Sequence, residues 1–287
     1  MPDVRDLCLV NGDAAFPSRL VCIPDPPVQL WVRGSPAHLP GFAQPSIAIV
    51  GSRSATRDGL DAARRIATGL ARAGVVIVSG LARGIDAVAH QSALDAGGCT
   101  VAVLGSGLLR MYPPEHGALA DRMLESGAVI SEYEPHTPPH PGLFPRRNRL
   151  VSGLADAVLV VEAPERSGAL ITAGAALDQG KDVFVVPGRV GGHRNRGGHL
   201  LIRDGARLVD SEDDLLLDMG WALAPACDRP TGGESPETVE FTVDDIVRET
   251  GELPQTALAR LLREELAGDI RRIGSARFLR VRRRVLT

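Results

Sequence analysis

The run Ser46-Ile47-Ala48-Ile49-Val50-Gly51 is almost entirely apolar and ends at a glycine. A short run of this kind is typical of a strand that is buried on both faces. The segment that follows favours a helix, because Thr56 can cap it and apolar residues recur at helical spacing up to Gly74. This strand and helix form the first of several such units, and the repetition predicts the fold class.

The same alternation continues downstream. We expect further strands at 75–78, 101–104, 129–130, 157–161, 183–186 and 207–209. We expect helices at 85–93, 113–126, 170–177 and 200–203, and a long loop, rich in histidine and proline, at 132–146. Apolar strands that alternate with helices predict an α/β fold with a doubly wound, mostly parallel sheet. In such sheets ligands bind beyond the carboxyl ends of the strands.

The segments on either side of this core are predicted to be organised differently. Residues 1–45 are rich in proline and are expected to form an N-terminal lead-in that packs on the main domain, 46–221. Residues 222–238 lose periodicity and are expected to be a linker. Within 239–287 we expect a helix that begins at Val243, a second helix at 255–267, and a hairpin of 270–273 and 278–281. That order predicts a small winged-helix-like domain.

Composition limits the classes of protein to be considered. The net charge is −3, so any nucleic-acid surface must be local. Lysine occurs only at Lys181 and every other basic residue is arginine, which weakens arginine identity as evidence of a site. The four cysteines lie far apart and show no metal-binding spacing, which favours a reducing cytoplasm. The sequence shows neither a secretion leader nor an apolar run of ~18 residues, so we expect no membrane association.

One cationic segment, Phe144-Pro145-Arg146-Arg147-Asn148-Arg149, stands out near the end of the long loop. Phe144 could stack on a nucleic-acid base, and Arg147 and Arg149 could hold phosphates. Asn148 could donate a hydrogen bond to a phosphate or a base. Elsewhere, Arg53 follows the first strand, and Ser167, Gly168 and Thr172 lie at or near the start of a helix whose N–H groups favour anions. The alternative is that Phe144 belongs to the core and the arginines form a solvated face.

Other nucleotide and catalytic motifs are poorly matched. Lys181 is followed by Asp182, so a Walker A loop is excluded, and Arg53 replaces a glycine that a dinucleotide fingerprint requires. We predict neither a metal site nor a cofactor. Four carboxylates could still lie near one sheet edge and support two-metal chemistry, or they could simply pair with arginines; these are Asp86, Glu132, Glu134 and Glu162.

Taken together, several ordered motifs resemble the DNA-processing protein A (DprA/Smf) family. They are Ala48-Ile49-Val50-Gly51-Ser52-Arg53, Ser79-Gly80-Leu81-Ala82-Arg83-Gly84-Ile85-Asp86-Ala87, Tyr112-Pro113-Pro114-Glu115-His116, Phe144-Pro145-Arg146-Arg147-Asn148-Arg149, Ser167-Gly168-Ala169-Leu170-Ile171-Thr172-Ala173 and Val186-Pro187-Gly188. The resemblance implies an extended Rossmann-like domain that binds single-stranded DNA without sequence preference. It also implies protection of incoming strands in natural transformation, and help in loading the RecA recombinase, with no catalysis.

The resemblance also implies roles for individual residues. The DNA-pocket positions of the family correspond here to Arg53, Gly80, Phe144, Arg147, Asn148, Arg149, Ser167 and Thr172. Family dimers form near the segment that holds Leu200 and Ile202. Two departures from the family pattern concern these sites. Pro113-Pro114 stands where many members carry a basic residue. Gly197-Gly198-His199 precedes the Leu-Ile pair, where the family usually has a polar asparagine.

These observations predict a homodimeric, cytoplasmic protein that binds single-stranded DNA and mediates recombinase loading. Two other classes remain open at this point. One is a metal-dependent hydrolase that processes nucleotides or nucleic acids with Glu162 and Asp86. The other is a scaffold that contacts a recombinase without binding DNA itself.

Overall fold

The computed structural model describes residues 6–191, 193–221, 239–242, 256, 260–261, 270–272 and 277–280. The chain divides into two compact units, Met1–Cys227 and Asp228–Thr287, which are treated separately. The domain boundaries expected from the sequence stay predictions.

A nine-stranded sheet forms the centre of the first unit, in the order β1-β2-β6-β5-β4-β3-β7-β8-β9. Seven consecutive members of this order, from β6 to β9, run parallel to one another, whereas β2 pairs antiparallel with both of its neighbours, β1 and β6. Chain order reverses at β3, which lies between β4 and β7. The predicted α/β fold with a doubly wound, mostly parallel sheet is confirmed. The strands are β1 (Leu7–Val10), β2 (Gln29–Gly34), β3 (Ser46–Val50), β4 (Val76–Ser79), β5 (Thr100–Leu104), β6 (Ala128–Ser131), β7 (Ala157–Val160), β8 (Asp182–Val185) and β9 (Arg207–Leu208).

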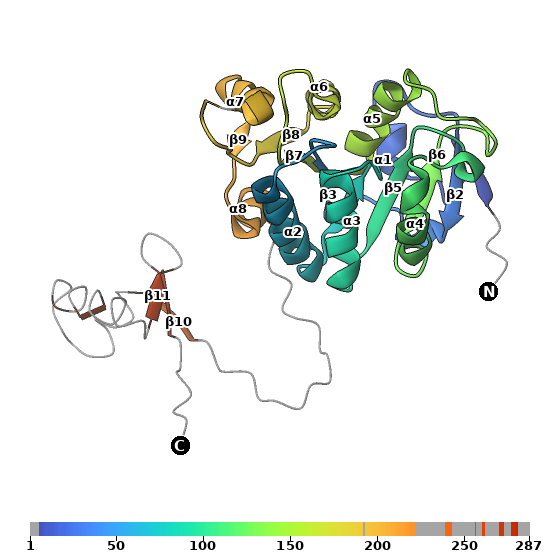
Figure 1. The fold of residues 1–287 in the computed structure, drawn as a ribbon. Coiled ribbons are helices and arrows are strands. Elements are labelled where there is room, and N and C mark those ends of the chain that lie inside the picture. The colour runs from blue at the N-terminus through green and yellow to red at the C-terminus, as the bar shows by residue number, and fades with distance from the viewer. Residues whose placement is uncertain are drawn as a thin grey trace. The chain divides into compact units, whose positions relative to one another are not determined.

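Helices cover both faces of this sheet because the strand side chains alternate between two cores. Ile47 and Ile49 pack with α2, α3 and α8, whereas Ala48 and Val50 pack with α1, α5 and α6. Figure 1 shows α2, α3 and α4 side by side on one face. The α-helices are α1 (Ser18–Val21), α2 (Arg57–Arg72), α3 (Ile85–Asp95), α4 (Gly117–Met123), α5 (Leu143–Leu154), α6 (Gly168–Asp178), α7 (Arg196–Arg203) and α8 (Glu212–Asp218).

Helix α5 is the main difference from the sequence-based expectation. A loop was predicted through residue 146, but the helix already begins at Leu143, so the last four residues of that prediction are wrong. Pro145 is tolerated because it is the third helical residue, where a backbone N–H has no partner inside the helix. The buried stripe is Arg147, Leu150, Val151 and Leu154. An arginine in the first position of that stripe concealed its helical period.

The segment 113–126 also differs from expectation. The helix predicted at 113–126 is a 3₁₀ turn, Pro114–His116, followed by the shorter α4.

The lead-in supplies strands β1 and β2, and β2 pairs with β6 at the sheet edge. Leu30 and Val32 alternate with more exposed residues along β2, as expected for a strand.

In the second unit three strands form a separate sheet, in the order β10-β12-β11. They are β10 (Val239–Thr242), β11 (Ile270–Arg272) and β12 (Arg277–Arg280). The antiparallel pairing of β11 with β12 confirms the predicted hairpin. The predicted linker and the helix that begins at Val243 lie outside the described residues, and the helix predicted at 255–267 is described only at residues 256 and 260–261. In the part of the chain that is described, no helix is long and apolar enough to cross a membrane.

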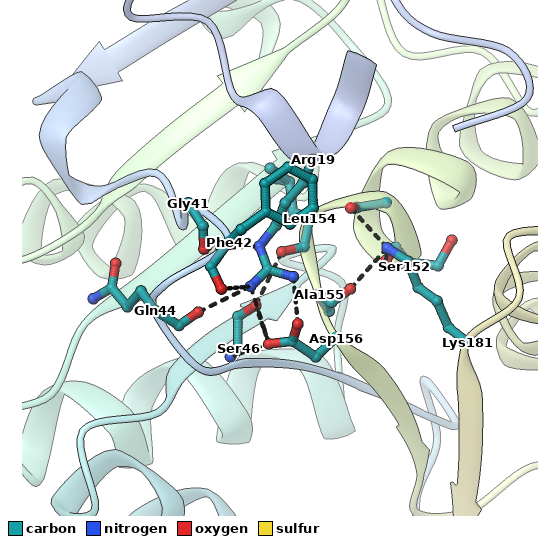
Figure 2. Close-up of polar contacts among 11 residues, drawn as sticks. Arg19, Gly41, Phe42, Gln44, Ser46, Ser152, Leu154, Ala155, Asp156 and Lys181 are labelled. Atoms are coloured by element: carbon teal, nitrogen blue, oxygen red, sulfur yellow. Dashed lines mark hydrogen bonds and ion pairs between the residues drawn. The ribbon is translucent and has the colours of Figure 1, made fainter. Parts of the chain in front are cut away.

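A partly buried ion pair fixes the lead-in to the start of two strands. The Arg19 guanidinium lies 2.5 Å from the nearer Asp156 carboxylate oxygen, and it donates to the carbonyl of Gly41 at 3.0 Å. Asp156 also accepts from the backbone N–H of Ser46, at the first residue of β3 (2.9 Å). Figure 2 shows this cluster. One carboxylate therefore joins α1, β3 and β7, and the lead-in is held by charge as well as by packing.

Lys181, the sole lysine, holds the end of α5 in the same region (Figure 2). Its Nζ donates to the carbonyls of Ser152, Gly153 and Ala155 at 2.7, 2.8 and 2.7 Å. Three diverging acceptors suit a tetrahedral ammonium better than a planar guanidinium, which accounts for a lysine here in an arginine-rich chain. Burial and the nearby charge of Arg19 lower the Lys181 pKa to about 8, so the ammonium still holds its proton at neutral pH.

His90 of α3 is fully buried against the sheet. Its Nδ1 lies 2.7 Å from the Thr100 hydroxyl, which itself donates to the Ile77 carbonyl at 2.8 Å. The single hydroxyl proton is thus used, so the ring donates from Nδ1, and Nε2 has no hydrogen-bond partner. Burial, with smaller contributions from His116 and Arg147, lowers the His90 pKa from 6.5 to about 3.

This burial predicts acid sensitivity. The unfolded chain takes up a proton at His90 near pH 6.5, whereas the folded chain does so only near pH 3. The stabilisation is therefore complete above about pH 6.5 and is lost as the pH falls toward 3, by at most about 1.4 kcal/mol per pH unit. Denaturant unfolding at several pH values gives the free energy of unfolding as a function of pH. Between pH 3 and 6.5 this free energy should change less steeply with pH for His90→Asn, because asparagine keeps a donor but does not titrate. Equal slopes for both proteins would contradict this assignment.

Candidate nucleic-acid interface

A groove of about 810 Å³ lies at the carboxyl ends of β3, β4 and β7, where the strand order reverses. Helices α5 and α6 supply its walls, and this is the position at which doubly wound sheets bind ligands. Every residue predicted to contact DNA lines the groove, with the exception of Arg149. The lining consists of Val50, Gly51, Ser52, Arg53, Ser54, Gly80, Ala82, Asp86, Tyr112, Pro139, Pro141, Phe144, Pro145, Arg147, Asn148, Val151, Pro164, Arg166, Ser167, Gly168, Ala169, Ile171 and Thr172.

Phe144 is a half-buried platform rather than a core residue. Its ring contacts Gly105, where an added Cβ would lie 2.6 Å from the ring. The exposed Arg53 places its guanidinium carbon 5.4 Å from the ring centroid, within the range of a cation–π contact. An aromatic ring beside an exposed cation provides a surface on which a base can stack next to a phosphate.

Arg147 forms the floor of the groove rather than its rim. The residue is only 4% exposed, and Nη1 donates to the Gly80 carbonyl at 2.8 Å and to the Val103 carbonyl. Gly80 must lack a side chain, because its Cβ would lie 2.6 Å from the guanidinium. The helix-borne arginine therefore holds α5 across the ends of β4 and β5.

Asp86 is the nearby buried carboxylate that compensates this charge. It accepts from the backbone N–H groups of Gly80 and Ala82 at 3.1 and 3.4 Å. Burial raises the Asp86 pKa, and the Arg147 charge and these N–H groups oppose that rise. Burial likewise lowers the Arg147 pKa to about 10, with Asp86 opposing. Arg147 thus stays charged at neutral pH.

The opposite wall is the start of α6. Ser167 caps this helix by accepting from the Ala169 N–H at 3.2 Å, and Thr172 is buried one turn later. Asn148 joins the two walls, since its side-chain amide donates to the Gly168 carbonyl at 3.2 Å. The positive end of α6 and the exposed Arg166 therefore lie on one side of the groove, and Arg53 lies on another.

Arg149 lies outside the groove lining. Its guanidinium bonds both Glu132 oxygens, at 2.6 and 3.0 Å, and Asp25 at 2.8 Å. The alternative reading from the sequence, in which a carboxylate pairs with an arginine, is therefore correct for Glu132. The other carboxylates are held separately: Glu134 accepts from Gln29 at 3.2 Å, and Glu162 accepts from the hydroxyl of Thr56 at 2.5 Å. Among the described residues no group of three or more His, Cys, Asp or Glu side chains could hold a metal.

Several groove residues were not predicted from the sequence, notably Tyr112, Arg166 and Ile171. Tyr112 follows β5 in a motif that was recognised but received no role. The signal that could have found it is an aromatic residue in a loop at the carboxyl end of a parallel strand, as at Phe144.

The predicted dimer residues lie on α7, next to the edge strand β9. Ile202 packs against the core, and Leu200 is half-buried. The neighbouring Leu208 on β9 is 54% exposed. This side of the sheet therefore combines a short free edge with apolar side chains.

Comparison with known proteins gives a consistent result. Residues 7–220 match the family described as DNA recombination-mediator protein A. Protein Smf of Escherichia coli is 40% identical over 294 residues, which covers 96% of this chain and 78% of that protein. DNA processing protein DprA of Streptococcus pneumoniae is 42% identical over 206 residues, which covers 72% of each chain.

Solved structures agree with the sequence comparison. The crystal structure of DprA from S. pneumoniae superposes with a TM-score of 0.69 at 39% identity, covering 75% of this chain and 74% of that one. DprA from Helicobacter pylori, whose structure was described for its single-stranded DNA binding mode, gives 0.67 at 29% identity, covering 76% of this chain and 96% of that one. The resemblance inferred from the motifs is confirmed, and the chain belongs to the DNA recombination-mediator protein A family.

Proposed function

We propose that this chain binds single-stranded DNA in the groove without sequence preference. The observation that carries the proposal is the half-buried Phe144 ring with Arg53 over it, in a groove that the N-terminus of α6 also lines. An aromatic platform between two positive features suits an unpaired base with a phosphate on either side. The single-stranded DNA binding of the H. pylori relative supports the same ligand.

In this mechanism the residues act at two levels. Arg53, Ser167 and the first N–H groups of α6 hold phosphates, Phe144 stacks a base, and Asn148 keeps the walls together. Arg147, Gly80 and Thr172 maintain the floor. Arg149 acts indirectly, because its ion pairs with Glu132 and Asp25 fix the outer side of α5.

At the cellular level we propose that the protein acts in the cytoplasm, protects incoming DNA in natural transformation, and helps to load the RecA recombinase during homologous recombination. The recombination-mediator description of its family supports this role. We propose that the protein acts by binding alone, without catalysis and without a cofactor. The hydrolase alternative has no specific support, because Glu162 is bonded to Thr56 and Asp86 to backbone N–H groups.

The stacking role of Phe144 can be tested directly. Phe144→Ala should weaken binding to a single-stranded oligonucleotide by about 5- to 150-fold, the equivalent of about 1–3 kcal/mol for one stacked base. Fluorescence anisotropy measures this loss. Phe42→Ala is the control, because the Phe42 ring is likewise in contact with an arginine, Arg19, but is exposed and lies outside the groove lining. Equal affinities of Phe144→Ala and the wild type would disprove stacking.

Because Arg53 and Arg147 have different roles, their alanine variants should have different effects on binding and stability. Arg53→Ala should weaken binding to all sequences about equally, reduce the salt slope by about 0.7, and leave the melting temperature unchanged. Arg147→Ala should weaken binding and also destabilise the fold by about 1–3 kcal/mol, because the buried carbonyls of Gly80 and Val103 lose their donor. Binding and thermal unfolding are measured together, with Arg72→Ala, at the far end of α2, as the control. A sequence-dependent loss in Arg53→Ala would indicate base readout instead.

We further propose that the protein is a homodimer that pairs through α7 and β9. Leu200→Glu should then yield monomers, because the new carboxylate would be buried at the interface yet solvated in the monomer. Light scattering gives the mass in solution. Leu217→Glu is the control, at an 82% exposed position on α8. A monomeric wild type, or a dimeric Leu200→Glu, would refute this interface.

A further inference from the structure

The aromatic surface of the groove does not end at Phe144. The Tyr112 ring lies 5.7 Å from the Phe144 ring, centroid to centroid, with the ring planes at 52°. The Arg83 guanidinium carbon lies 6.0 Å from the Tyr112 ring centroid. Arg53, Phe144, Tyr112 and Arg83 are therefore linked by successive contacts of cation with ring, ring with ring, and ring with cation. Four different segments of the chain contribute one member each.

Tyr112 contributes little to the hydrophobic packing of the fold. It is 38% exposed and belongs to none of the three hydrophobic cores, whereas the neighbouring Met111 packs against one. Aromatic residues make up only 3% of this chain, yet two lie side by side at this surface. An exposed ring beside an exposed cation, in a chain that uses few rings, indicates a binding role.

The space next to Tyr112 borders the main groove. A small hollow of about 30 Å³ is lined by Arg83 and Pro113 together with residues that also line the main groove; the shared residues are Arg53, Gly80, Ala82, Tyr112, Phe144 and Arg147. The surface next to Phe144 therefore continues directly to Tyr112 and Arg83.

We propose that Tyr112 and Arg83 form a second subsite, which takes the nucleotide adjacent to the one stacked on Phe144. This inference rests on the proposed function. The 52° tilt prevents the two rings from sandwiching one base between parallel faces, so each ring takes its own base. Arg83 then holds the phosphate of the second nucleotide, as Arg53 does for the first.

In the free protein, the guanidinium of Arg83 is paired with the carboxylate of Glu115. Its carboxylate lies 2.5 Å from Arg83 Nε, and both side chains are about half exposed, at 47% and 55%. An exposed ion pair of this kind is weak, so a phosphate can displace the carboxylate from the guanidinium. Glu115 is therefore an internal competitor for the cation of the second subsite.

The test is the dependence of affinity on oligonucleotide length, with oligothymidylates from two nucleotides upward. Relative to the wild type, Tyr112→Ala should lose about 5- to 150-fold more affinity for oligomers long enough to reach the second subsite than for the shortest oligomers. Tyr112→Phe keeps the ring and should bind like the wild type at every length. Melting temperatures check that both variants are folded.

Two results would overturn the inference alone. Tyr112→Ala could bind like the wild type at all lengths, or it could lose the same factor at all lengths, which would mean that Tyr112 only supports Phe144. A wild type that binds no oligothymidylate would overturn the proposed function and this inference with it.

The role of Arg83 is tested with two variants that should change the affinity in opposite directions. Arg83→Ala should weaken binding of the longer oligomers only, whereas Glu115→Gln should strengthen it. Glu165→Gln, at an exposed acidic residue next to the groove residue Arg166, controls for the general effect of removing a negative charge. If both glutamine variants gain by the same factor, Arg83 does not bind a phosphate in this subsite.

Discussion

The groove depends on one buried cation, the guanidinium of Arg147. It bridges the carbonyls of Gly80 and Val103 at the ends of two neighbouring strands and is balanced by the buried Asp86. A buried charge is costly unless hydrogen bonds and a nearby opposite charge compensate it, so this arrangement favours the observed position of α5 over the sheet. Lys181 fixes the other end of the same helix through three carbonyls. With both ends fixed, Phe144 is carried at the rim as a rigid platform rather than as part of a mobile loop.

The positive character of the groove comes from position rather than from composition. The net charge of the chain is −3, but the acidic residues around the site are engaged with partners of their own. Glu132 is bonded by Arg149, and Glu162 by Thr56. Among the described residues no carboxylate forms an ion pair with Arg53, which therefore faces the groove with its charge available to a ligand. An arginine-rich composition could not reveal this difference between a structural and an exposed arginine.

The strands were predictable because parallel strands that are covered on both faces are short apolar runs, as at Ser46–Val50 and Ala157–Val160. The location of the site followed from the same pattern, since strand ends in a doubly wound sheet meet at one edge. Helix α5 was missed because its buried stripe begins with Arg147, a residue that periodicity treats as exposed. The pairing of Arg149 with Asp25 and Glu132 joins residues far apart in the chain, and no local pattern contains that information. For the same reason the neighbourhood of Tyr112 and Phe144 became visible only in three dimensions.

The central claim is that an unpaired strand is held by phosphate contacts and by a stacked base. Titrating salt against binding of single-stranded and duplex DNA of equal length tests it most directly. If the groove neutralises ~3–5 phosphates, the logarithm of the single-strand affinity should fall with the logarithm of salt at a slope of about −2 to −3.5. Duplex should bind more weakly at every salt concentration, because paired bases cannot offer a face to Phe144. Equal or tighter binding of duplex would contradict the account.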